Sequence, residues 1–397
     1  MKLLICNAGS TSLKFKLWEM PQETALAEGK VERIGLGDAI FTYRNPALSF
    51  EEKLERRNIM TYTEGISMFL SHLTDPRCGA VPSMDAVEAV GFKTVLSKDH
   101  YGVHRIDSAV KAGMRAYFTV APAHNGPYLE AIEVFEKLLP GKPLVGVFET
   151  AFHRSIPEYR RQFALPAEWT EKYGLRRMGY HGASHGYIAE KTGKTGRVIS
   201  CHLGGSSSIC AIRDGVSIDN SFALSLQAGM PHNNRVGDLD AYVVLYLLKE
   251  GLSWEEIEHG LNGEGGLKGV SGTTGDMRDL TRAMDEGSDR ARLAFDMYVD
   301  SIVRYIGSYH VFLGGLDTLV FTGGIGENSA RLRQAVCARL ACLGVRIDPE
   351  KNEGGEPERV ISAEDSPVTV RVIPAGEEWM VARAAYRHLT ESRPCGR

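Results

Sequence analysis

The sequence predicts a two-domain protein of the α/β class, and three observations support this. The chain has 397 residues, more than one hydrophobic core usually organises. Apolar runs of strand length alternate with segments of helical periodicity, as in α/β proteins. A hairpin pattern with a glycine- and serine-rich turn occurs twice, which suggests a duplicated domain. The match is short, however, and two unrelated hairpins are an equally frequent explanation for it.

The strand and helix signals follow one another along the chain. The first hairpin has strands at 3–6 and 13–17 around a turn at 7–12, and the second opens with a strand at 198–201 and a turn at 202–208. Further strands are expected at 144–148, 318–322 and 368–373, and helices at 127–139, 183–192, 293–313, 329–343 and 377–389. Ser184 is a candidate cap of its helix, and the glycine-rich, acidic stretch 352–365 is expected to be a loop.

Composition and charge exclude several classes of partner. The chain is 43% hydrophobic and 24% charged with a net charge of −4, so it lacks the basic surplus that nucleic acid or an anionic membrane would require. We find no apolar run of membrane-span length, and the first ten residues turn polar too early for a signal peptide. The seven cysteines are scattered and odd in number, so we expect reduced thiols in a cytoplasmic protein.

Four glycine-rich segments are candidates for contact with phosphate or a nucleotide. The turns at 7–14 and 202–208 would present backbone N–H groups to phosphate oxygens, although an ordinary hairpin tip is the alternative for each. The segment 321–328 follows a strand and opens a helix, where glycine lets a ligand approach and the helix start favours anions. In the segment 272–279, Asp276 is a candidate ribose ligand, or else the cap of a surface helix.

Polar residues of the kinds used in catalysis are also scattered along the chain without a spacing rule. Taken singly, each is more often structural or exposed than catalytic: Lys93, Glu149, His181, Asn233, Asn234, Arg235 and Glu377.

Seven motifs in order make the chain resemble the acetate kinase family, within the superfamily of actin, sugar kinases and heat-shock chaperone ATPases. They are NAGSTSLKF, FETAFH, GYHGASH, HLGGSSS, SGTTGDMRD, FTGGIGENS and IPAGEE, and the resemblance runs from Met1 to about Leu389. It implies a duplicated RNase H-like (actin-like ATPase) fold, with 1–147 and 376–397 in one domain and 148–375 in a nucleotide-binding domain. It also implies ATP as co-substrate, Mg²⁺ or Mn²⁺ as cofactor, a small carboxylate as acceptor, and a homodimer.

The motif positions assign a role to individual residues. The metal would be held by Asn7 and Glu377, and catalysis would use Glu149, His181 and Arg235. The acceptor would meet Lys93, Val95, Ala123 and Leu226. The nucleotide and its phosphates would contact Lys14, His202, Gly204, Gly205, Ser206, Ser207, Asp276, Met277, Arg278, Gly324, Ile325, Gly326, Glu327 and Asn328.

The departures from the family pattern gather in the acceptor pocket. The family's catalytic aspartate falls at Glu149 and its carboxylate-binding arginine at Lys93, which lacks arginine's planar fork. Ala123 and Leu226 replace a leucine and a proline. We therefore hypothesise that phosphoryl transfer is kept while acceptor preference has moved from acetate. The alternatives are a kinase that uses another phosphoryl donor, and a nucleotide-binding protein that has lost turnover.

Overall fold

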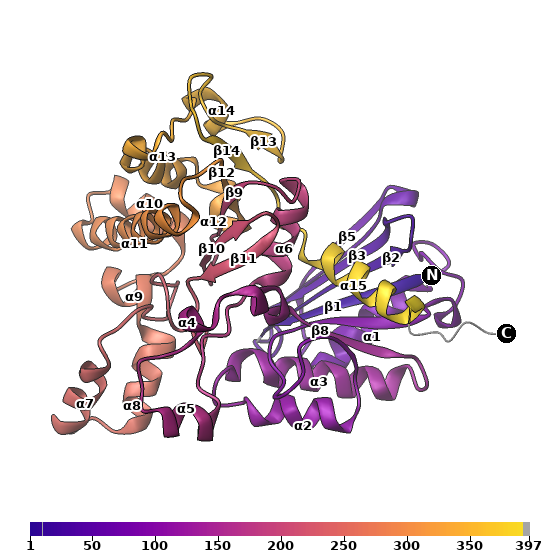
Figure 1. The fold of residues 1–397 in the computed structure, drawn as a ribbon. Helices are drawn as coiled ribbons and strands as arrows, with labels where there is room; N and C mark the ends of the chain where they lie inside the picture. The colour runs from indigo at the N-terminus through magenta and orange to yellow at the C-terminus, as the bar shows by residue number, and fades with distance from the viewer. Residues whose placement is uncertain (10, 392–397) are drawn as a thin grey trace. The chain divides into compact units, whose positions relative to one another are not determined.

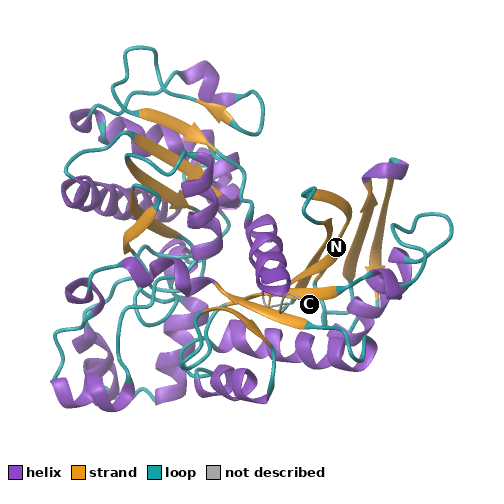
Figure 2. Cartoon of the chain, turned by 45° about the vertical axis from the view of Figure 1, so that its right-hand side comes forward, coloured by secondary structure: helices purple, strands orange, loops and turns teal. Residues whose placement is uncertain are grey.

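The computed structural model describes residues 1–9 and 11–391, and the chain divides into two compact units. Unit 1 comprises Met1–Ala151 and Gly376–Arg397, and unit 2 comprises Phe152–Ala375. In each unit, helices lie on both faces of one sheet (Figure 2). In the described part of the chain, no helix has the length and apolarity that a membrane span requires.

Unit 1 is built on an eight-stranded sheet with the order β5-β4-β3-β2-β1-β6-β8-β7 (Figure 1). The strands are β1 (Lys2–Gly9), β2 (Ser12–Glu19), β3 (Thr24–Glu32), β4 (Ala39–Asn45), β5 (Phe50–Arg57), β6 (Ala89–Thr94), β7 (Gly102–Arg105) and β8 (Leu144–Phe148). Its main helices are α1 (Tyr62–Leu73), α2 (Ser108–Ala116), α3 (Pro122–Leu138) and α15 (Glu377–Glu391).

Unit 2 has a six-stranded sheet with the order β11-β10-β9-β12-β14-β13. The strands are β9 (Arg197–His202), β10 (Ser208–Arg213), β11 (Val216–Asn220), β12 (Thr318–Thr322), β13 (Arg359–Val360) and β14 (Thr369–Val372). The helices are α4 (Glu158–Arg161), α5 (Ala167–Tyr173), α6 (Gly182–Lys191), α7 (Ala241–Lys249), α8 (Trp254–His259), α9 (Gly266–Ser271), α10 (Met277–Asp285), α11 (Asp289–Leu313), α12 (Gly323–Asn328), α13 (Ala330–Arg339) and α14 (Pro349–Glu353).

The two sheets share one topology. In unit 1, β3, β2 and β1 form an antiparallel meander, and β6 and β8 continue from β1 in parallel. In unit 2, β11, β10 and β9 form the same meander, and β12 and β14 continue in parallel. The repeat that the two hairpins suggested therefore extends over five strands of each sheet, which confirms the predicted duplicated α/β fold.

Continuous apolar runs form the central strands, as expected where helices cover both faces of a sheet. The segment Leu3–Cys6 of β1 is fully buried, and so is Ala89–Phe92 of β6. Helix α15 returns to unit 1 and packs Val381 and Ala385, four residues apart, against Leu3 and Ile5. In unit 2 the 25-residue α11 supplies much of the core.

Several predicted element boundaries were wrong. The residue at the N-cap of α6 is His181, and the hydroxyl of Ser184 instead bonds Nδ1 of His202. Asn7 to Gly9 continue β1 as partners of β2, so the first turn offers fewer free N–H groups than predicted. Helix α3 begins five residues early and contains Pro127, and α11 begins four residues early. The predicted helix 329–343 is α13 followed by a short 3₁₀ turn, and β13 lies within the predicted loop.

Candidate active site

Three candidate residues lie at the carboxyl ends of parallel strands in unit 1. Asn7 and Lys93 each follow the paired residues Cys6 and Phe92 of β1 and β6, and Glu149 directly follows β8. Ligands of open α/β sheets bind at this end, because the loops there diverge and leave room. Residues far apart in the sequence are thus brought to one sheet edge.

Lys93 lies between two carboxylates. Its Nζ is 2.8 Å from Oε1 of Glu377 at the start of α15, and 3.7 Å from Oε2 of Glu149. All three side chains are largely buried, at 12%, 13% and 2% exposure. Burial alone would lower the pKa of Lys93, but the carboxylates of Glu149 and Glu377 outweigh it and raise that pKa. Lys93 is therefore a fixed ammonium group.

Tyr128 of α3 belongs to the same cluster, although no motif in the sequence indicated it. Its hydroxyl donates to Oδ1 of Asn7 at 2.7 Å, and its side chain is buried. Burial raises the pKa of Tyr128, so it stays a neutral donor. An aromatic residue on a helix is usually part of the core, which is why the sequence offered no signal for this contact.

The oxygen atoms of this cluster fit a magnesium ion. Carboxylate and amide oxygens are the protein ligands that Mg²⁺ prefers, and it commonly uses one or two carboxylates together with substrate phosphates. Asn7 and Glu377 supply such oxygens. Among the described residues, no three His, Cys, Asp or Glu side chains form a closed metal cage, so the remaining ligands would be phosphate oxygens and water.

The other predicted residues of unit 1 lie near this edge or outside the described side chains. Val95 is buried just beyond the end of β6. Lys14 is the ladder partner of Asn7 and lines a groove of about 390 Å³ along β2, β3 and β4. The side chain of Ala123 is outside the described part of the structure.

In unit 2, a cavity of about 660 Å³ gathers most of the predicted nucleotide residues. Its lining contains Gly204, Gly205, Asp276, Met277, Arg278, Gly324, Ile325 and Asn328. It also contains residues for which no nucleotide role was predicted: Asn233, Thr281, Ser329, Ala330, Arg331 and Glu353. Five segments that are distant in the sequence therefore meet at one cavity.

The glycines at the start of α12 make room for a ligand. A Cβ atom on Gly324 would meet no heavy atom within 4 Å, so this backbone borders open space. Gly323 has φ of +78°, and a Cβ there would lie 2.7 Å from the carbonyl oxygen of Leu203. Behind them, Oε1 of Glu327 accepts from the N–H of Gly323 and of Ala375.

Asp276 is both the cap of a helix and part of the cavity lining, so the two predicted roles are compatible. Its carboxylate caps α10 by accepting from the N–H of Arg278, and it pairs with the Arg278 guanidinium. The Arg278 hydrogen bond lowers the pKa of Asp276. The Arg278 side chain is 87% exposed and still lines the cavity, so its planar face is available to a ring.

The predicted catalytic groups of unit 2 lie beside the serine-rich turn after β9. Arg235 donates to the Ser206 hydroxyl, and burial lowers the pKa of Arg235 to about 10, which still leaves it charged at neutral pH. His181 bonds the Ser208 hydroxyl through Nδ1, and its ring lies 4.1 Å from that of His202. Ser207 bonds the backbone of Gly204, which fixes the shape of the turn. Leu226 is buried.

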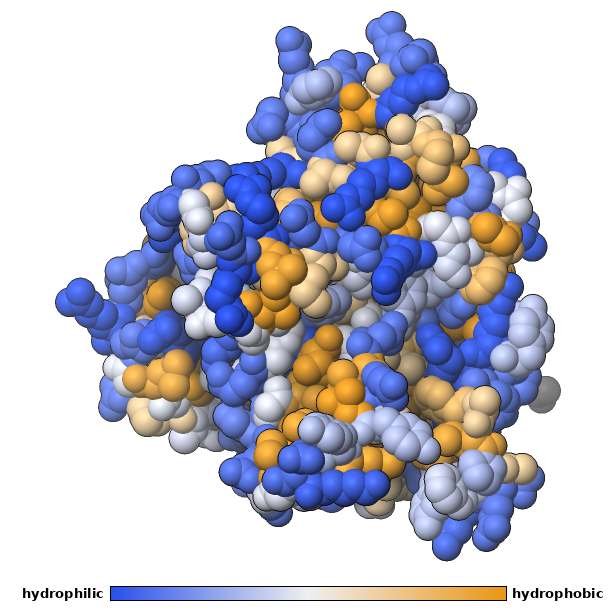
Figure 3. Space-filling model, turned by 90° about the vertical axis from the view of Figure 1, so that its left-hand side faces the viewer, coloured by the Kyte–Doolittle hydropathy of each residue, from blue (hydrophilic) through white to orange (hydrophobic). Residues whose placement is uncertain are grey.

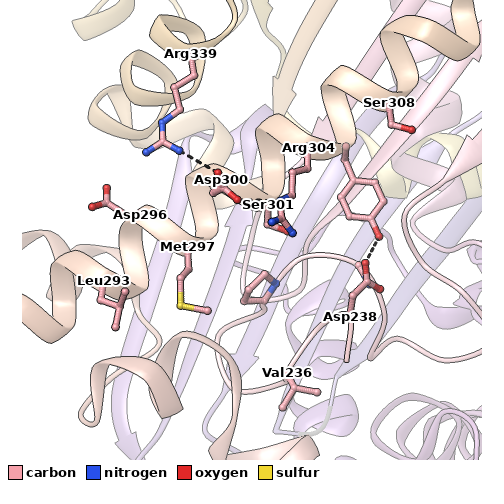
Figure 4. Close-up of a pocket in the computed structure, with 13 residues that line it drawn as sticks. Val236, Asp238, Leu293, Asp296, Met297, Asp300, Ser301, Arg304, Ser308 and Arg339 are labelled. Carbon is pink, nitrogen blue, oxygen red and sulfur yellow. Dashed lines mark hydrogen bonds and ion pairs between the residues drawn. The ribbon is translucent and has the colours of Figure 1, made fainter. Parts of the chain in front are cut away.

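A second cavity of about 660 Å³ runs along α11 (Figure 4). Its charged groups largely satisfy one another. Asp300 pairs with Arg304 and Arg339, and Tyr305 donates to Asp238. This groove offers no converging set of polar groups comparable to that of the cavity beside α12.

The profile of the acetokinase family matches residues 2–383. The acetate kinase of Moorella thermoacetica is 41% identical over 392 residues, covering 96% of this chain and 98% of that protein. That of Phocaeicola vulgatus is 41% identical over 391 residues, with the same coverage.

Solved structures agree with the sequence comparison. A Porphyromonas gingivalis acetate kinase superposes with a TM-score of 0.86 at 37% identity, covering 98% of this chain and 99% of that one. A propionate kinase from Francisella tularensis gives 0.88 at 31% identity, covering 96% and 98%.

Proposed function

The chain belongs to the acetokinase family, and we propose that it transfers the terminal phosphoryl group of ATP directly to a carboxylate oxygen of acetate or a similar short acid. The products are ADP and an acyl phosphate. The observation that carries this proposal is the cavity beside α12, where five separated segments converge with the glycines that a nucleotide requires.

The charged groups support in-line transfer without a covalent enzyme intermediate. Such a reaction depends on positioning and on stabilising the charge of the transferring group. Arg235 would offer a permanent cation to that group, and His181 a hydrogen bond. The turn Gly204–Ser207 would contact phosphates, and Asp276 and Arg278 would contact the nucleoside.

The cluster in unit 1 would hold the metal and the acceptor. Asn7 and Glu377 would bind Mg²⁺ or Mn²⁺, which neutralises phosphate charge when bound. Glu149 would orient groups at the reacting centre. Lys93 is already engaged by Glu377 and Glu149, so it would attract the acceptor carboxylate less than an unpaired arginine would. This supports an acceptor preference that has moved from acetate.

An acid panel with hydroxylamine trapping of the acyl phosphate tests this function. Acetate, propionate, butyrate and longer acids are each supplied with ATP or pyrophosphate, and Arg235→Met serves as the inactive control. We expect hydroxamate formation with ATP and a higher kcat/KM for an acid other than acetate. Acetate as the best substrate would overturn the shifted preference, and pyrophosphate as the better donor would overturn the use of ATP. Nucleotide binding without product from any acid would indicate a binding protein that has lost turnover.

We further propose a homodimer, and an exposed apolar surface in unit 2 supports it. Helix α7 has no fully buried residue, although it is rich in large apolar side chains. Tyr242, Leu245 and Tyr246 on it are exposed, as is the neighbouring Trp254. Figure 3 shows patches of apolar side chains on the side of the molecule where α7 and α8 lie. Large apolar patches mark association surfaces, and a second copy would cover this one.

The proposed location is the cytoplasm. The six cysteines within the described residues carry free thiols, and five of them are buried, which suits a reducing compartment.

A further inference from the structure

We propose that a buried chain of two serines and two histidines fixes the tautomer of His181, so that its Nε2 carries the proton and acts as a neutral hydrogen-bond donor. This inference rests on the proposed contact of His181 with the transferring phosphoryl group, and it specifies the chemical form in which the residue acts.

This hydrogen-bond chain consists of three successive bonds. Nδ1 of His181 is 2.9 Å from Oγ of Ser208, and the same oxygen is 2.8 Å from Nε2 of His185. Nδ1 of His185 is then 2.9 Å from Oγ of Ser200. The residues come from the start of α6, from α6 itself, and from the paired strands β10 and β9. All four side chains are buried, which excludes water as an easy alternative partner.

His185 is neutral, so its two ring nitrogens have different roles. It is fully buried, and burial lowers the pKa of His185 well below its usual range. A neutral imidazole has one nitrogen that donates and one that accepts. The tautomer of His185 therefore decides which neighbouring serine donates and which accepts.

The Ser200 hydroxyl sets the direction of the chain. Among the described residues, Nδ1 of His185 is the one side-chain partner of this hydroxyl. A buried hydroxyl proton without an acceptor costs the desolvation of a polar group, so Ser200 donates to Nδ1 of His185. The proton of His185 then lies on Nε2 and is donated to Ser208. Ser208 therefore donates its hydroxyl proton to Nδ1 of His181, and the ring proton of His181 lies on Nε2.

The same chain of hydrogen bonds opposes protonation of His181. An imidazolium at this position would place a second proton on Nδ1, and Ser208 would have to accept it. Ser208 would then donate to His185, whose own proton would move to Nδ1, and the proton of Ser200 would lose its acceptor. One distant hydroxyl therefore favours the neutral form of His181.

The surrounding groups are consistent with a neutral histidine cluster. His202 of β9 lies 4.1 Å from His181 between ring centroids and bonds Ser184. His153 lies 5.9 Å from His185, donates Nε2–H to the carbonyl of Tyr180, and accepts from Ser217. Burial lowers the pKa of His153 to about 4, and Arg161 acts in the same direction. Neither His153 nor His185 therefore adds a cationic imidazole near neutral pH.

Imidazole ¹H–¹⁵N correlation spectra of the full-length protein, labelled at histidine, test the proposal without requiring activity. We expect the wild type to show His181 as the Nε2–H tautomer from pH 8 to pH 6. In Ser200→Ala, Nδ1 of His185 loses its hydrogen-bond partner whichever tautomer His185 adopts. We therefore expect mixed tautomers, and protonation of His181 at a pH higher by roughly one unit. The acid limb of kcat should shift by the same amount, while the KM values for ATP and acid change less than about twofold.

Ser217→Ala is the matched control, because it removes a buried Ser–His bond of the same core outside the chain. We expect it to leave the His181 signals unchanged, and Ser200→Thr, which keeps the hydroxyl, to retain the wild-type signals. If the alanine variant does not fold, the tautomer of His181 in the wild type still tests the proposal. An Nδ1–H tautomer in the wild type, or identical spectra for wild type and Ser200→Ala, would overturn the proposal. A kinase assay without product would instead contradict the proposed function and leave the tautomer measurement intact.

Discussion

Lys93 illustrates how a buried charge is tolerated in this protein. Its ammonium group contacts Glu377 and lies near Glu149, and these carboxylates restore the stabilisation that water would have given. The three residues come from a strand end, a segment after another strand, and a helix start that follows unit 2 in the sequence. Their contact thus joins the two separate segments of unit 1.

Lys93→Met should lower the free energy of unfolding by about 3 kcal/mol, because it leaves two buried carboxylates without their cation. Urea unfolding measures this. Lys93→Met combined with Glu377→Gln should recover part of the loss. Lys53→Met is the matched control, since Lys53 and Glu55 are both more than half exposed and solvent screens such surface pairs, so its loss should be clearly smaller. Equal losses at the two lysines would contradict the buried-pair argument.

His153 makes stability depend on pH. Its pKa is lowered by burial to about 4, against about 6.5 in the unfolded chain. Between these values the unfolded state binds more protons, so stability is complete above pH 6.5 and is lost as pH falls toward 4. His153 alone should account for about 2 kcal/mol between pH 7 and pH 5. Urea titrations should show a smaller difference between these pH values in His153→Asn, and an unchanged difference would contradict this account.

Residue types could be predicted from the sequence, but several of their contacts could not. Lys93, Glu149 and Glu377 were named as candidates, yet nothing in the chain indicated that they meet, since 284 positions separate Lys93 from Glu377. Tyr128 was missed because a buried aromatic residue is common in any helix. Ser184 matched the pattern of a helix cap, but its hydroxyl bonds His202 instead.

At the scale of elements, the turn from β12 into α12 depends on two adjacent glycines with different requirements. Gly323 needs its positive φ and its close approach to Leu203, whereas Gly324 borders the cavity. The sequence predicted this strand-to-helix turn correctly because apolar strand, glycine pair and helix follow one another directly. Helix starts were predicted less well. Because proline is common at the first position of a helix, the sequence predicts a start at Pro127, but this residue lies inside α3.

Gly324→Ala should raise the KM for ATP roughly threefold or more with little change in melting temperature, because its methyl group enters the cavity without striking the protein. Initial rates at varied ATP and thermal melts measure both effects. Gly323→Ala should do the opposite and lower stability by more than about 1 kcal/mol, through its left-handed backbone and the nearby carbonyl. An unchanged KM for ATP in Gly324→Ala would argue against nucleotide binding at this cavity.

At the scale of the whole molecule, the proposed homodimer should depend on the exposed residues of α7. Tyr246→Asp places a charge at an exposed position of a helix that has no fully buried residue, so folding should be unaffected. The Kd of the dimer should rise at least about tenfold. Sedimentation velocity at several concentrations measures this. Tyr159→Asp is the control, because Tyr159 is also exposed, at 75% against 61% for Tyr246, but lies on α4. Loss of dimers in both variants, or in neither, would contradict an interface at α7.

The course of the chain through unit 1 has a consequence for synthesis on the ribosome. Residues 1–151 leave the ribosome first, but Leu3 and Ile5 are covered by α15, which is made only after all of unit 2. Unit 2 is continuous and can complete its core as it emerges, whereas one face of the first sheet stays uncovered until α15 has been made. A nascent chain of this protein therefore exposes apolar surface for most of its synthesis, which makes the first sheet, and not the second, the segment that chaperones would be needed to protect.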